Sequence, residues 1–179
     1  MDLVAFFQPL EASVIGEWMR GSVKAMPIVE ATHVLAAITV FGTILIVDLR
    51  LLGIPGVNRA FTRVSADTAR ITWLAFVLAV VTGFLMFAAN AHTYVVNTAF
   101  GLKLLAIAAA GLNMLVFEGF TRRGEAGWDV GVQAPPAAKL AGLLSILLWV
   151  TVIFLARWIG FTKGYDFSVP DDPNIKFEF

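Results

Sequence analysis

The chain has 179 residues, of which 59% are hydrophobic and 15% charged, and its formal net charge is zero. A soluble domain typically carries about a quarter charged residues, so this chain has too little polar surface to coat a water-soluble globule. The balanced charge gives no electrostatic support for nucleic-acid binding. Cysteine is absent, which excludes disulfides, cysteine nucleophiles and thiolate-ligated iron–sulfur clusters within the chain.

The first segment, residues 3–20, is predicted to form an amphipathic helix. Apolar side chains recur at three- and four-residue steps from Leu3 to Trp18, while Glu11 and Glu17 take other angles. Such a segment is too polar to span a membrane and apolar enough on one face to lie in the headgroup layer. A helix packed on another protein subunit fits the same pattern.

Four long apolar segments follow, each near the ~20 residues that an α-helix needs to cross a bilayer. We predict transmembrane helices over residues 28–52, 71–89, 100–120 and 140–161, and a polar tail over 162–179. The chain is therefore predicted to be all-α. We expect a single membrane domain, 1–179, in which a four-helix bundle follows an N-terminal interfacial amphipathic helix.

Lys and Arg residues in short loops predict the orientation. The two connections 53–70 and 121–139, with their flanks, hold seven: Arg50, Arg59, Arg63, Arg70, Arg122, Arg123 and Lys139. The terminal segments hold four, namely Arg20, Lys24, Lys163 and Lys176. We therefore expect a multi-pass protein of a bacterial cytoplasmic (inner) membrane, with both termini in the periplasm.

Five ionisable residues are predicted to gather in the outer half of the bundle. Glu30 and His33 share one face of the first helix at i and i+3. The antiparallel path returns His92, which follows the second helix, to the same side. Lys103 opens the third helix there and Arg157 closes the fourth. Ionisable groups inside spans are costly and by default indicate a functional site.

Two imidazoles and two cations in one region are typical of a b-type haem site. His33 is the predicted axial ligand and His92 the candidate second metal ligand, while Lys103 and Arg157 would neutralise the propionates. Glu30 would accept a hydrogen bond that orients the imidazole of His33. Other interpretations stay open: His33 as a hydrogen-bonded packing residue, His92 as an exposed loop histidine, and both cations as side chains that snorkel to the interface.

At the opposite end of the first helix, we expect Asp48 and Arg50 to form ion pairs with Arg70 or Glu118. A di-iron site is not expected, because it needs two Glu-x-x-His motifs and two further glutamates on facing helices, and only one such motif is present. No catalytic triad or glycine-rich phosphate loop is found.

Three stretches of the sequence resemble those of a known family. They are residues 33–53 of the first predicted helix, the pair Thr82-Gly83 and the run Phe100-Gly-Leu-Lys103. Over roughly residues 28–120 the chain resembles a family of small, uncharacterised bacterial four-helix membrane proteins. It is more distantly similar to the CopD and HemJ-type haem-associated membrane proteins. That similarity implies haem ligation by His33 and an essential role for Lys103. In a departure from it, Asn113 and Phe117 stand where a further histidine is expected, and the Trp-Gly pair common after the first histidine is absent.

Two functions remain from this reading. The first is a haem b-binding membrane protein that transfers electrons from a quinone or a partner subunit to an outer-face redox protein; a quinone beside Glu30 and Lys103 is compatible with it. Whether this makes the chain an oxidoreductase or an electron-transfer subunit is left open. The second is a cofactor-free accessory subunit that scaffolds a larger membrane complex or a homo-oligomer. A small transporter is less favoured, because no helix is visibly broken at mid-depth.

Overall fold

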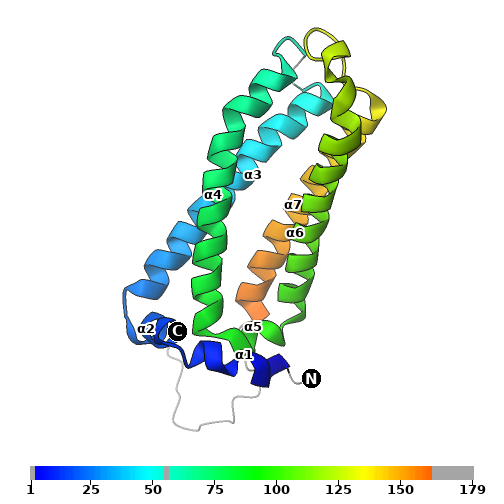
Figure 1. Ribbon diagram of the computed structural model, residues 1–179. Helices are drawn as coiled ribbons and strands as arrows, with labels where there is room; N and C mark the ends of the chain where they lie inside the picture. The colour runs from blue at the N-terminus through cyan, green and yellow to red at the C-terminus, as the bar shows by residue number, and fades with distance from the viewer. Residues whose placement is uncertain (1–2, 55–56, 163–179) are drawn as a thin grey trace, which may run out of the picture.

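The computed structural model of this chain describes residues 3–54 and 57–162 (Figure 1). Four long helices make up the bundle: α3 (Ala25–Leu52), α4 (Phe61–Ala89), α6 (Thr98–Val116) and α7 (Pro136–Thr162). All four, with α6 continued to Phe120, are long and apolar enough to cross a membrane. The described residues contain no β-strand. The predicted all-α fold is confirmed, with four helices that are long and apolar enough to cross a membrane.

Three short helices lie across one end of the bundle: α1 (Leu3–Glu11), α2 (Val14–Gly21) and α5 (Ala91–Val95) (Figure 1). We call this the terminal end, because α3 starts and α7 finishes there. At the opposite end, the loop end, a π-helical turn (Phe117–Thr121) and a 3-10 turn (Arg122–Gly127) lead from α6 towards α7. The polar tail predicted for 162–179 falls, after Thr162, outside the described residues.

One predicted boundary is wrong at the N-terminal side. The expected single helix over 3–20 is two helices, because the chain turns at Ala12 and Ser13. The Ser13 hydroxyl caps α2 by accepting from the main-chain N–H of Gly16, at 3.3 Å. The connection between α4 and α6 contains a further short helix, α5.

The second span also starts earlier than predicted. α4 begins at Phe61 rather than at 71. The additional turns carry the charged residues Arg63, Asp67 and Arg70. Because the helix was predicted from a run of apolar residues, these charged turns were not included in it. Their helical conformation is set instead by packing at the loop end, where Phe61 is fully buried among Phe117, Trp128 and other apolar residues.

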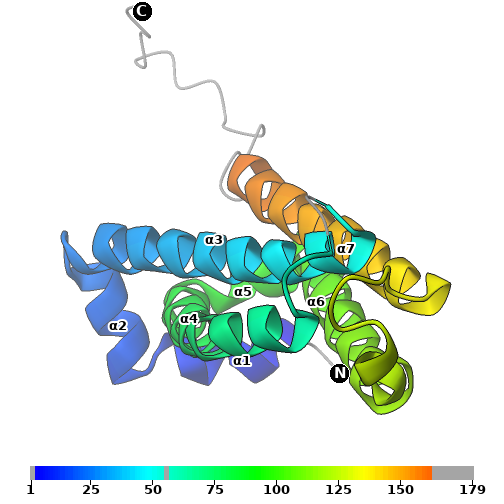
Figure 2. The ribbon, with the colours of Figure 1, turned by 90° about the horizontal axis from the view of Figure 1, so that it is seen from above.

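The bundle is made of two helix pairs joined through one contact. α3 packs along α4, α6 packs along α7, and α3 also packs against α7. Viewed from above, α4 and α6 lie on the same side of the α3–α7 contact (Figure 2). Few or no contacts join α4 to α6 in the described part of the chain. Between these two helices the bundle is therefore open.

Arg50 holds the loop end together. Its side chain is 4% exposed. Its Nε donates to the carbonyl of Arg59 and its Nη2 to the carbonyl of Asp129, both at 2.7 Å. The Asp129 carboxylate in turn accepts from the main-chain N–H of Thr62, at 2.8 Å, and so caps the first turn of α4. Arg50 was expected to form an ion pair, and that expectation is wrong: its hydrogen bonds go to main-chain carbonyls.

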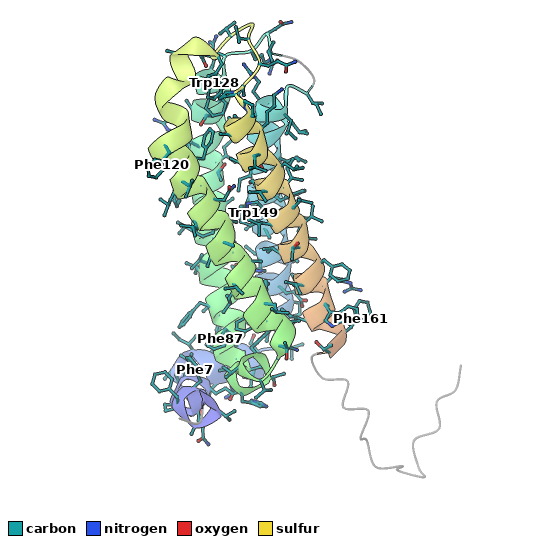
Figure 3. All side chains as sticks on the ribbon, turned by 90° about the vertical axis from the view of Figure 1, so that its right-hand side faces the viewer. Phe7, Phe87, Phe120, Trp128, Trp149 and Phe161 are labelled. Atoms are coloured by element: carbon teal, nitrogen blue, oxygen red, sulfur yellow. The ribbon has the colours of Figure 1, made fainter. Side chains whose placement is uncertain are left out.

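Arg20 has a similar role at the terminal end. One guanidinium nitrogen donates to the carbonyl of Ala89 at 2.8 Å and the other to the carbonyl of Glu11 at 2.7 Å. These are carbonyls at the ends of α4 and α1, which lack partners within their own helices. Phe7 of α1 packs edge-on against Phe87 of α4, with ring centroids 5.2 Å apart (Figure 3). The short helices are therefore docked firmly under α4.

Candidate functional site

His33 lies against the main chain of α4. Its Nδ1 is 2.9 Å from the carbonyl oxygen of Ala79 and 3.1 Å from Oγ1 of Thr82. A carbonyl can only accept, and the Thr82 hydroxyl already donates to the carbonyl of Leu78 at 2.6 Å. Nδ1 must therefore carry the proton, which makes Nε2 the nitrogen with the free lone pair in the neutral imidazole. No hydrogen bond to Nε2 is found among the residues that the structure describes.

Gly83 makes this close approach feasible. A Cβ at position 83 would lie 3.1 Å from Cε1 of His33 and 3.5 Å from its Nδ1. The imidazole therefore occupies the space that any larger residue would fill. Thr82, next to it, is 5% exposed. Thr82 and Gly83 together therefore form the surface of α4 against which the imidazole ring of His33 packs.

Two of the other predicted residues lie near His33. Lys103 of α6 and Glu30 of α3 are both close enough for their charges to act on the His33 imidazole. Lys103 is half-buried, and its ammonium lies 5.3 Å from the centroid of the Phe100 ring. Phe100 stacks on Phe87 at 5.6 Å. The structure thus places an imidazole, a cation and a carboxylate at the terminal end of the bundle, and no hydrogen bond or ion pair joins the three among the described residues.

His92 has a different environment. Its side chain is 57% exposed, and Nδ1 lies 2.8 Å from Oε1 of Glu11. Nε2 lies 3.1 Å from Oγ1 of Thr93. Both ring nitrogens are thus engaged in the helix layer at the terminal end, and no interaction joins His92 to His33 in the described residues. This contact links α5 to α1.

Arg157 is exposed and packs on its own helix. Its guanidinium carbon lies 4.6 Å from the centroid of the Phe161 ring, one turn further along α7 (Phe161 is labelled in Figure 3). It shares the terminal end with His33 and Lys103, but no contact joins it to either of them in the described residues. Its position matches the snorkelling that was left open as an alternative to propionate pairing.

The partner of His33 was missed by sequence reasoning. Glu30 was expected to orient the imidazole, yet the acceptor at Nδ1 is the Ala79 carbonyl, supported by Thr82. Every residue has a main-chain carbonyl, so the pattern of side chains in a sequence does not show which carbonyl accepts a given hydrogen bond. The Thr82-Gly83 pair was visible in the sequence, but without the facing helix nothing connected it to His33. Within the described residues, no group of three or more His, Cys, Asp or Glu side chains could hold a metal ion.

Comparison with known proteins gives a family and no activity. Residues 6–162 match the model of a family of unknown function, DUF6644, and the chain belongs to that family. The match runs from within α1 to the last residue of α7. No curated protein and no solved structure matches the chain.

Proposed function

We propose that this membrane protein binds haem b through Nε2 of His33 and takes part in electron transfer. The observation that carries the proposal is the hydrogen bond from His33 Nδ1 to the Ala79 carbonyl. In metal-ligating histidines, the second nitrogen commonly donates to a carbonyl or carboxylate, which fixes the tautomer and aims the free lone pair. An ionisable side chain inside a membrane helix is costly and by default indicates a functional site.

The donor set suits haem better than a bare metal ion. A haem iron needs only one or two protein ligands, because the macrocycle supplies the other four. One available imidazole is therefore enough, whereas a zinc or di-iron site would require three or more side chains. Bound haem would supply a reversible one-electron carrier.

The other predicted site residues would have supporting roles in haem binding. Lys103 would neutralise a propionate near the membrane boundary, and Arg157, exposed at the same end, is a second candidate for that part. Glu30 would influence the imidazole through its charge rather than through a hydrogen bond. His92 is left out as a ligand, because both its nitrogens already have partners. The similarity to CopD and HemJ-type proteins agrees with haem binding, and no comparison finds that relationship.

The test is haem content after expression with sufficient haem. Purified wild-type protein should carry haem with Soret and α-band absorption, and His33→Ala should lose it. His92→Ala is the matched control and should retain the absorption, since it removes an imidazole from the same end of the bundle. Free imidazole added to His33→Ala should restore the bands, which separates lost ligation from lost folding. Wild-type protein that neither carries nor takes up haem would contradict the proposal, as would full absorption in His33→Ala.

A second candidate function is an accessory subunit of a larger membrane complex. It is favoured by the apolar surface outside the four spans, where Phe6, Val14 and Val23 are 63%, 83% and 92% exposed. The headgroup layer and a partner subunit are both able to cover such a surface. Purification in mild detergent decides between them: a stable partner should co-purify, and Val14→Glu should release it. A chain that runs alone would oppose this candidate.

A further inference from the structure

A second feature of the bundle lies in its loop half, away from His33. A cavity of about 250 Å³ lies between α3, α4, α6 and α7. Five aromatic side chains line it: Phe61, Trp73, Phe76, Phe117 and Trp149. Trp149 lies about half-way along α7 (Figure 3). The volume is just below the roughly 300–1,000 Å³ of pockets for drug-sized ligands, so it suits a single substituted ring.

The cavity contains one buried carboxyl group with an unused oxygen. Asp48 of α3 lines the cavity and is 5% exposed. The Ser145 hydroxyl is hydrogen bonded to this carboxyl group, but Oδ2 has no hydrogen-bond partner among the described residues. A buried acceptor without a partner is costly, and a ligand that donates a hydrogen bond would remove that cost. From the sequence, Asp48 was expected to form an ion pair. Its Oδ2 takes part in no such pair among the described residues.

The cavity opens sideways, towards lipid. Trp73 of α4 and Met114 of α6 both line it, and they are 56% and 49% exposed at the bundle surface. These two helices share few or no contacts in the described chain, so the opening lies between them. A ligand would therefore enter from the hydrocarbon layer and leave an apolar tail there.

Depth and chemistry restrict the class of ligand. Asp48 is four residues before the end of α3, about 6 Å from it at 1.5 Å per residue. A fatty acid would bring a carboxylate against Asp48, and a phospholipid headgroup is too polar for walls built from aromatic rings. Aromatic side chains favour a flat ring packed edge-on or offset. Oδ2 of Asp48 can accept a hydrogen bond from a donor on that ring, such as a hydroxyl.

We infer that this cavity binds the ring of a lipid-soluble quinol, with a ring hydroxyl donating to Oδ2 of Asp48 and the isoprenoid tail passing out between α4 and α6. The inference does not need haem, and it places the quinol at the loop half rather than beside Glu30 and Lys103. The cavity and the proposed haem site are connected by helix α3, which contributes residues to both. Val40, which lines the cavity, follows His33 by seven residues on the same face of α3, about 10 Å along the axis.

Binding of ubiquinol-1 to the purified full chain in lipid nanodiscs tests this inference. Two of the five tryptophans, Trp73 and Trp149, line the cavity, so their fluorescence should be quenched saturably. Asp48→Leu should weaken binding roughly ten-fold, the loss expected for one buried hydrogen bond. Asp67→Asn, an acid of α4 that does not line the cavity, should leave binding unchanged.

A second variant tests the cavity without touching Asp48. Gly111 of α6 lines it, and a Cβ at that position meets no atom within 4 Å. Gly111→Leu should therefore fold and block the ring. Gly101→Leu, on the same helix with equally open space and outside the cavity, is the matched control. Saturable binding in wild type that is lost only in Gly111→Leu and weakened in Asp48→Leu supports the inference.

Three results would overturn it. These are absence of saturable quenching in wild type, equal binding by wild type and Gly111→Leu, and displacement of ubiquinol-1 by equimolar decanol. The last result would show an acyl-chain groove without ring recognition. None of these results depends on haem content, so the inference and the proposed function fail separately.

Discussion

Arg50→Met offers a quantitative test of how the loop end is held. The side chain is 4% exposed and makes two short hydrogen bonds to the carbonyls of Arg59 and Asp129, each at 2.7 Å. Hydrogen bonds from a charged donor contribute about 1.5–3 kcal/mol each, or roughly 3–6 kcal/mol for the pair. Against this, Nη1 is buried without a hydrogen-bond partner among the described residues, and its removal returns about 1–3 kcal/mol. The net loss expected is about 3 kcal/mol.

Thermal unfolding of the purified protein in mild detergent, followed by near-ultraviolet circular dichroism, measures this loss. For a chain of this size, 1 kcal/mol corresponds to roughly 2–4 °C, so Tm should fall by about 6–12 °C. Arg63→Met, an exposed arginine of α4, is the matched control and should change stability by less than about 0.5 kcal/mol. Arg50→Lys should lie between the two, because an ammonium lacks the fixed fork that reaches two carbonyls at once.

If Arg50→Met unfolds at the wild-type temperature, these hydrogen bonds do not hold the two loops, and the reasoning is refuted. A fall equal to that of Arg63→Met would have the same meaning, because the loss would then follow from charge alone.

Three further predictions concern separate contacts. Gly83→Val should displace the His33 ring and remove most of the bound haem absorption, whereas Gly42→Val, which meets open space, should not. Gly16→Ala should lower stability by about 1–3 kcal/mol in thermal unfolding, because its Cβ would lie 2.8 Å from the Ala88 carbonyl; Gly21→Ala, with no neighbour within 4 Å, should be near neutral. The main-chain N–H of Thr62 donates to Asp129 and lowers the pKa of that carboxyl below its ordinary value near 3.8. Its stabilisation is therefore complete above about pH 4 and lost as pH falls through the lower folded-state pKa, so acid titration of Tm should show a smaller drop for Asp129→Ala than for wild type.

The spans could be predicted from the sequence because hydropathy and length determine them directly. The start of α4 could not, because Phe61–Arg70 is helical through contacts with Phe117 and Trp128 rather than through its own pattern. The split between α1 and α2 depended on one serine cap, which a stripe of apolar residues does not reveal.

The candidate site was predictable only in part. The antiparallel path was enough to place His33, Glu30 and Lys103 at one end, and in the structure all three lie towards the terminal end of the bundle. The partner of His33 was hidden because it is the carbonyl of Ala79, which any residue would supply. Asp48 was assigned an ion pair because a buried charge usually needs one, and the sequence could not show that α4 and α6 stand apart and leave a cavity beside it.

The central claim is that His33 offers Nε2 to a haem iron. The most direct measurement is the dithionite-reduced minus oxidised optical spectrum of the purified wild-type chain beside His33→Ala. The account predicts the α-band and Soret changes of a b-type haem in the first sample and their absence in the second. A featureless wild-type spectrum after haem supplementation, or identical spectra from both samples, would contradict it.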